Sequence, residues 1–159
     1  MLLIRFFLFT LFVSMVSPSV IAGAAMGMFS ELVLFSDVEG VVMKEGVPVA
    51  GAEIVQEITY QEPGKIPVRT IRTGADGRFT LARVTTGAGL SRIIPGQPSV
   101  RQRLMIRHNG IEYEGWRHNK NSYELNSELD GRSLRLVCEL SNTPDFEGKH
   151  YGICQVAPE

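Results

Sequence analysis

The sequence contains few of the residues that enzyme sites and nucleic-acid surfaces need. Its 159 residues include two cysteines, three histidines and one tryptophan, and 16 Lys and Arg are set against 17 Asp and Glu. Charge so nearly balanced provides no basic surface for nucleic acid and no polybasic face for anionic lipid, so we expect no nucleic-acid partner. A hydrophobic content of 44% excludes a disordered chain, and the length fits one domain.

Motifs for catalysis and for metal binding are also missing from the sequence. No serine lies in a Gly-x-Ser-x-Gly elbow, which an α/β-hydrolase nucleophile requires. The three histidines, His108, His118 and His150, are widely spaced in turn-like neighbourhoods, where exposed side chains are expected rather than a zinc site. We therefore predict a protein that is not an enzyme and that uses no metal or other cofactor.

The one long apolar run stands at the start of the chain. Residues 1–5 carry a single positive charge, residues 6–16 are almost wholly apolar, and small residues follow from Ala22 onward. This order is typical of a secretory signal peptide over residues 1–24, cleaved after Ala22 or Ala24. The alternative is an uncleaved membrane anchor, since apolar residues return at Met26.

The predicted signal peptide sets the expected location and domain organisation. Residues 25–37 form a lead-in segment and residues 38–159 a single domain, with no membrane insertion after cleavage. No Asn-x-Ser/Thr acceptor for glycosylation occurs, so we expect a bacterial periplasmic protein. In an oxidising compartment Cys138 and Cys154 are expected to form one disulfide, the alternative being two buried free thiols.

Short runs of alternating apolar and polar residues predict an all-β chain. Strands are expected over residues 38–44, 52–60, 68–73, 79–84, 101–108, 111–116, 133–140 and 151–156. Turns are expected at 76–77, 109–110 and 130–131, a long loop at 85–99 and an irregular polar stretch at 117–130. The arrangement that satisfies this pattern is an antiparallel β-sandwich of about seven or eight strands with a single core.

Two segments carry a family resemblance. Residues 40–54 read GVVMKEGVPVAGAEI and residues 73–81 read TGADGRFTL. The pattern resembles the carboxypeptidase regulatory-like, transthyretin-type domains, in which a strand is followed by Gly-x-Pro-Val-x-Gly-Ala and then by Thr-x-x-x-Gly-x-Phe. The resemblance covers residues 40–82 and implies a Greek-key β-sandwich. It implies no particular function, because such domains are accessory modules in unrelated proteins.

Some relatives in this family are enzymes, and they differ from this chain. Transthyretin-like hydrolases of hydroxyisourate end in Tyr-Arg-Gly-Ser, whereas residues 155–159 here read QVAPE. No catalytic residue is therefore carried over from them.

Binding is the function that these observations leave. A signal peptide followed by one sandwich domain is similar in organisation to the immunity proteins encoded beside bacterial type VI secretion effectors. We predict a periplasmic immunity or inhibitor protein whose partner is a toxin effector enzyme, neutralised by occlusion of its active site. The alternative is an accessory module that binds carbohydrate or an envelope partner, and a small hydrolase comes third.

Candidate partner-binding residues surround the predicted hairpin at 109–110. Arg107, Tyr113, Trp116 and Arg117 lie close to it, and aromatic residues and arginine are enriched at interface hot spots. For Trp116 the alternative is a place in the core. The segments 85–99 and 117–127 are further interface candidates, because long loops in a compact domain are often functional.

Overall fold

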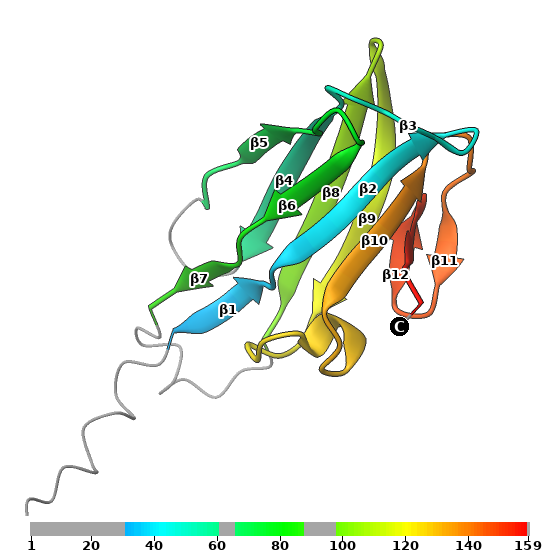
Figure 1. Cartoon of the computed structure of the whole chain (residues 1–159). Coiled ribbons are helices and arrows are strands. Elements are labelled where there is room, and N and C mark those ends of the chain that lie inside the picture. Colours follow the sequence, from blue (N-terminus) through cyan, green and yellow to red (C-terminus); the bar gives the residue numbers. More distant parts are fainter. Residues whose placement is uncertain (1–30, 61–65, 88–97, 159) are drawn as a thin grey trace, which may run out of the picture.

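The computed structural model describes residues 31–60, 66–87 and 98–158 and is built almost entirely of β-strands (Figure 1). This part of the chain forms thirteen strands and one short 3-10 helix, η2 (Ser127–Leu129), and no α-helix. It contains no helix of the length and apolarity needed to cross a bilayer. The all-β prediction is confirmed, and the strands exceed the predicted number because several are only two to four residues long.

Two sheets face each other, and a two-stranded ribbon extends them. The five-stranded sheet contains β13 (Cys154–Val156), β10 (Leu134–Glu139), β2 (Val38–Lys44), β3 (Val47–Pro48) and β6 (Arg78–Leu81). The six-stranded sheet has the order β11 (Asp145–Glu147), β12 (His150–Gly152), β9 (Ile111–Lys120), β8 (Val100–His108), β4 (Glu53–Tyr60), β5 (Arg69–Arg72). The ribbon pairs β1 (Leu32–Phe35) with β7 (Val84–Thr86).

Neighbouring strands are antiparallel with one exception. Strands β2 and β10 pair in parallel through six residue pairs, although about ninety residues separate them in the chain. This pairing places β10 beside the strand that begins the predicted domain, so the two ends of the domain meet in one sheet (Figure 1). The sandwich therefore closes around a single core.

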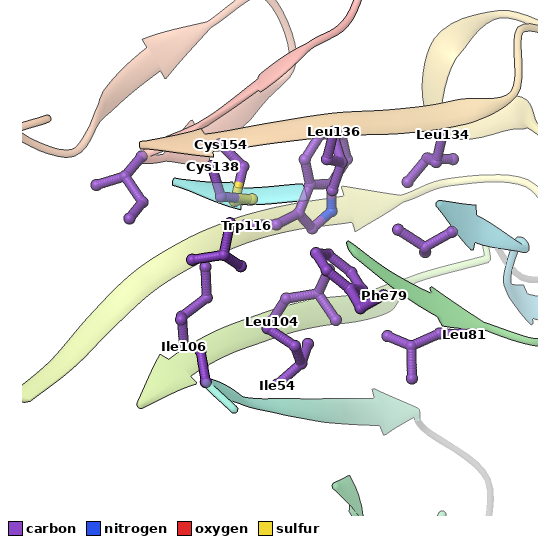
Figure 2. Packing of buried hydrophobic residues seen from close by; sticks show 14 of the residues in the cluster. Ile54, Phe79, Leu81, Leu104, Ile106, Trp116, Leu134, Leu136, Cys138 and Cys154 are labelled. Atoms are coloured by element: carbon purple, nitrogen blue, oxygen red, sulfur yellow. A yellow bond between two sulfur atoms is a disulfide. The ribbon is translucent and has the colours of Figure 1, made fainter. Parts of the chain in front are cut away.

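The core lies between the two sheets and is drawn in Figure 2. Inward-facing positions at alternate residues supply it, among them Ile54 of β4, Leu104 and Ile106 of β8, and Leu134 and Leu136 of β10. This alternation is what a strand with one buried face requires, and each such side chain contributes about 1.5–3 kcal/mol when removed from water. The phenyl ring of Phe79 lies so close to Gly40 that a Cβ at Gly40 would overlap it.

The predicted disulfide is confirmed. Cys138 of β10 and Cys154 of β13 are directly opposite each other in the antiparallel pair, and their sulfur atoms are bonded. Both residues are buried in the core beside Trp116 (Figure 2). The bond holds the last strand of the chain against the five-stranded sheet.

The predicted hairpin at Asn109–Gly110 is also confirmed. Both residues have positive φ, 51° and 75°, as a type I′ turn requires, and the turn joins β8 to β9. Glu45 and Gly46 make the same kind of turn between β2 and β3, with φ of 51° and 77°. The Glu139 carboxylate accepts hydrogen bonds from the backbone N–H groups of Glu45, Gly46 and Ser141.

Several predicted boundaries need correction. The stretch 117–130, predicted to be irregular, is strand as far as Lys120. The prediction failed because the inward-facing residues here, His118 and Lys120, are polar and conceal the alternation of a half-buried strand. Strand β1 lies within the predicted lead-in 25–37, with Leu34 and Phe35 fully buried. Strand β7 begins at the last residue of the predicted strand 79–84 and runs into the loop predicted at 85–99, and β11 lies between the strands predicted at 133–140 and 151–156. The predicted signal peptide 1–24 and most of the loop predicted at 85–99 lie outside the described residues.

Candidate functional site

Two of the three histidines, His118 and His150, and the tryptophan lie where β9 and β12 meet. His118 and His150 are directly opposite each other in this strand pair, and they are only 7% and 2% exposed, so the expectation that they lie on the surface was wrong. The His150 ring stacks on Trp116 with ring centres 4.0 Å apart. Burial lowers the pKa of His150, outweighing the Cys154 carbonyl and Glu147. These rings are therefore part of the core.

Trp116 cannot contact a partner. Its side chain is fully buried between the sheets, which confirms the alternative interpretation as a core residue and removes it from the candidate surface (Figure 2). Tyr113 is partly buried against the same core. Among the described residues, no group of three or more His, Cys, Asp or Glu side chains is placed to hold a metal ion.

A buried ion pair fixes the far end of β9. The Lys120 ammonium lies 3.0 Å from the Glu128 carboxylate of η2, and neither side chain is exposed. Glu128 also accepts hydrogen bonds from the amide N–H and hydroxyl of Ser36 and from the Gln102 amide. Burial raises the pKa of Glu128, but Gln102 and Lys120 outweigh it and the pKa is lowered; burial lowers the pKa of Lys120. All donors and acceptors of this cluster face inward, which gives it a structural role.

The outer face of the six-stranded sheet carries ordered rows of charge. Three arginines of this face, on β5 and β8, each pair with a carboxylate on a neighbouring strand. Arg72 lies 2.6 Å from Glu53, Arg107 lies 2.8 Å from Glu112, and Arg103 makes two 2.9 Å hydrogen bonds to Glu114. These partly exposed pairs are each worth about 0–1 kcal/mol and fix the side chains in position.

One end of this face has a different composition, and we call it the arginine–aromatic patch. It consists of Arg101, Arg117, Asn119, Phe146 and Tyr151, which line a hollow of about 550 Å³ together with His118, Asn121 and Lys149. None of the residues lining this hollow is acidic. The Arg117 guanidinium lies 4.5 Å above the centre of the Tyr151 ring, and the Phe146 and Tyr151 ring centres are 5.0 Å apart. The Phe146 side chain, on edge strand β11, is 72% exposed.

The opposite end of the same face is the tip of the β8–β9 hairpin. In Figure 1 this tip stands beyond the ends of the neighbouring strands. Ile111, the first residue after the turn, is 54% exposed, and the Arg107–Glu112 pair bridges the two strands just below it. A hollow of about 460 Å³ lies beside the tip, lined in part by Arg107, His108 and Arg72.

The structure thus separates the four predicted partner-binding residues. Arg107 lies at the hairpin tip, Arg117 lies in the arginine–aromatic patch, Tyr113 is partly buried, and Trp116 is in the core. Sequence reasoning missed Phe146, because it enters the patch only through the pairing of β11 with β12 and of β12 with β9. Its one local signal is that Phe146 and Tyr151 stand two positions before and two positions after the Gly148–Lys149 turn.

Comparison with known proteins identifies a family. Residues 38–143, which include both sheets' central strands and the hairpin, match the family described as domain of unknown function DUF6795. No curated protein matches the chain.

Proposed function

The chain belongs to the DUF6795 family, and we propose that it is an exported, non-catalytic binding protein of the periplasm that neutralises a toxin effector enzyme by occluding its active site. The observation that carries this proposal is the β8–β9 hairpin. Its tip projects beyond the ends of the neighbouring strands (Figure 1). Ile111, the first residue after the turn, is an exposed apolar side chain. A projecting tip of this shape fits a concave active site.

The hairpin is preorganised for such a contact. Its strands pair from the Val100–Lys120 pair to the His108–Ile111 pair, with one irregularity at Gly115. The turn residues already have the dihedral angles that a type I′ turn needs. A rigid element loses little conformational entropy on binding, so more of its contact energy appears as affinity. At the tip, Ile111 would supply apolar contact and Arg107, held by Glu112, a charged anchor.

A competition experiment between sister cells tests this proposal. Cells in which the gene is deleted, then complemented with variants, are exposed to parental cells that carry the effector. We expect the deletion to reduce survival, the native gene to restore it, and Ile111→Asp to restore it poorly. Val68→Asp is the matched control, because Val68 is 59% exposed just before β5, which β4 separates from the hairpin strand β8. Deletion cells that survive as well as the parent would refute the proposal.

The second candidate function is an accessory module that holds an envelope partner. The arginine–aromatic patch favours it, because exposed aromatic and arginine side chains gather there around a concave surface. The two functions differ in a simple readout. If the protein is an envelope module, deletion of its gene leaves sister-cell survival unchanged, and the protein co-purifies with envelope material. Substitutions in the patch, and not Ile111→Asp, then abolish this co-purification.

A further inference from the structure

We infer that the arginine–aromatic patch is a contact surface of its own, which binds a carboxylate-bearing segment of a protein. Arg117 and Arg101 would take the carboxylates and Phe146 an adjacent apolar side chain. The patch is separate from the hairpin tip. Arg117 is six residues along β9 from Ile111, a separation of about 20 Å at the rise of an extended strand.

The positive charge of the patch is unbalanced. In the part of the chain that the structure describes, Arg72, Arg103 and Arg107 on this face each have a carboxylate partner, and neither Arg101 nor Arg117 has one. Arg117 is moreover directly opposite Arg103 in the β8–β9 pair. Arg103 is already paired with both Glu114 and Glu57, so neither of these carboxylates is left to balance the charge of Arg117.

The Arg117 side chain is held in a position from which it can bind a carboxylate. Its guanidinium lies over the Tyr151 ring, an interaction that holds the side chain while leaving the N–H groups at the edge of the guanidinium plane available. Those N–H groups form a planar fork that matches the two oxygens of a carboxylate. The fork is therefore positioned before a ligand arrives, which lowers the entropic cost of binding.

The arrangement of the aromatic rings in the patch favours a protein segment over a saccharide. Sugars bind aromatic residues through an open ring face, and here one face of Tyr151 is covered by Arg117. Phe146 packs at a tilt of 58° against Tyr151, so the two rings do not form a flat platform. An exposed Phe beside a carboxylate-binding Arg instead suits an acidic segment with apolar residues between its charges. Glu and Asp alternating with Leu or similar residues would meet both requirements.

Binding of defined probes to the full mature protein tests the inference. The probe is a short acetylated peptide of repeated Glu-Glu-Leu. Its binding is measured in NMR titrations by the changes in the chemical shifts of the protein's amide and arginine Nε signals. The comparison probes are the matching Gln-Gln-Leu peptide and oligogalacturonate, an acidic saccharide. We expect the Glu peptide to shift signals of the patch, and Arg117→Gln to weaken its binding about tenfold or more.

A matched arginine variant makes the result specific. Arg72→Gln removes the same charge from the same face, but from a side chain already paired with Glu53, and we expect a change of less than about twofold. Thermal unfolding of each variant verifies that it is folded.

Three results would overturn the inference. They are equal binding of the Gln peptide, equal losses in Arg72→Gln and Arg117→Gln, and binding of oligogalacturonate to the patch without binding of the Glu peptide. Each would leave the hairpin proposal intact, because that proposal is tested through Ile111.

Discussion

Removing the Lys120 side chain is expected to destabilise the fold severely. In Lys120→Met the Glu128 carboxylate stays buried and loses the ammonium group paired with it, keeping the hydrogen bonds from Ser36 and Gln102. Breaking a fully buried ion pair from one side typically costs about 3–5 kcal/mol, because the remaining charge is uncompensated. For a domain of this size that corresponds to a fall in Tm of about 10–20 °C.

Urea unfolding at neutral pH, followed by tryptophan fluorescence, measures the free energy of unfolding. Lys149→Met is the matched control, since Lys149 pairs with Asp130 at 2.6 Å but both side chains are largely exposed, and we expect a loss of about 0–1 kcal/mol. Lys120→Met/Glu128→Leu is expected to lose less than the sum of the single variants, because no lone charge remains. A loss below about 1 kcal/mol for Lys120→Met, or one equal to that of Lys149→Met, would refute the reasoning.

Three further stability effects follow from particular contacts. Replacing Cys138 and Cys154 by Ala should cost about 3 kcal/mol in denaturant unfolding, the loop entropy expected for a sequence separation of 16 residues, and an unchanged midpoint would contradict this. Slight burial raises the pKa of Glu139, but backbone N–H donors outweigh it and lower the pKa to about 2 from 4.5, so its stabilisation is complete above pH 4.5 and is lost as the pH falls toward 2. The difference in Tm between the native protein and Glu139→Gln should therefore become smaller as the pH falls from 4.5 toward 2. Measurement of Tm for both proteins across this range tests the prediction, and a difference that grows as the pH falls would contradict it. Gly152→Ala should cost about 1–3 kcal/mol in thermal or urea unfolding, because φ is 152° and a Cβ would overlap the Gly115 carbonyl oxygen; native stability would contradict this.

Much of the fold is predictable from local pattern. Strands β2, β4 and β8 are recognisable because alternate residues are apolar or turns flank them. The Asn109–Gly110 turn fixes the hairpin register as far as the Met105–Glu114 pair, beyond which the pairing shifts by one residue. The disulfide follows from compartment and count, and the structure shows why it forms: the two cysteines are a directly opposed pair. These features depend on residues close together in sequence or on chemistry that has one outcome.

The features that escape prediction depend on distant partners. Lys120 and His118 look like surface residues in sequence, yet each faces inward because Glu128, or the Lys149 carbonyl, provides a partner that only the fold brings near. The parallel pairing of β2 with β10 has no local signature at all.

The candidate surfaces were predictable only in part. Arg107 and Arg117 were identified because they flank a strong turn. Phe146 and Tyr151 were not, because two strand pairings are needed to bring them beside Arg117. The alternation that predicts a strand also assigns a face, but it does not say which charges on that face will find partners.

The occlusion proposal predicts a target enzyme encoded beside this gene, and inhibition of that purified enzyme is the most direct test. Titration with the mature protein is predicted to abolish turnover at about one equivalent, competitively with substrate, and Ile111→Asp is predicted to raise the concentration needed by about tenfold or more. Turnover that is unaffected at excess protein, or inhibition that Ile111→Asp leaves unchanged, would contradict it.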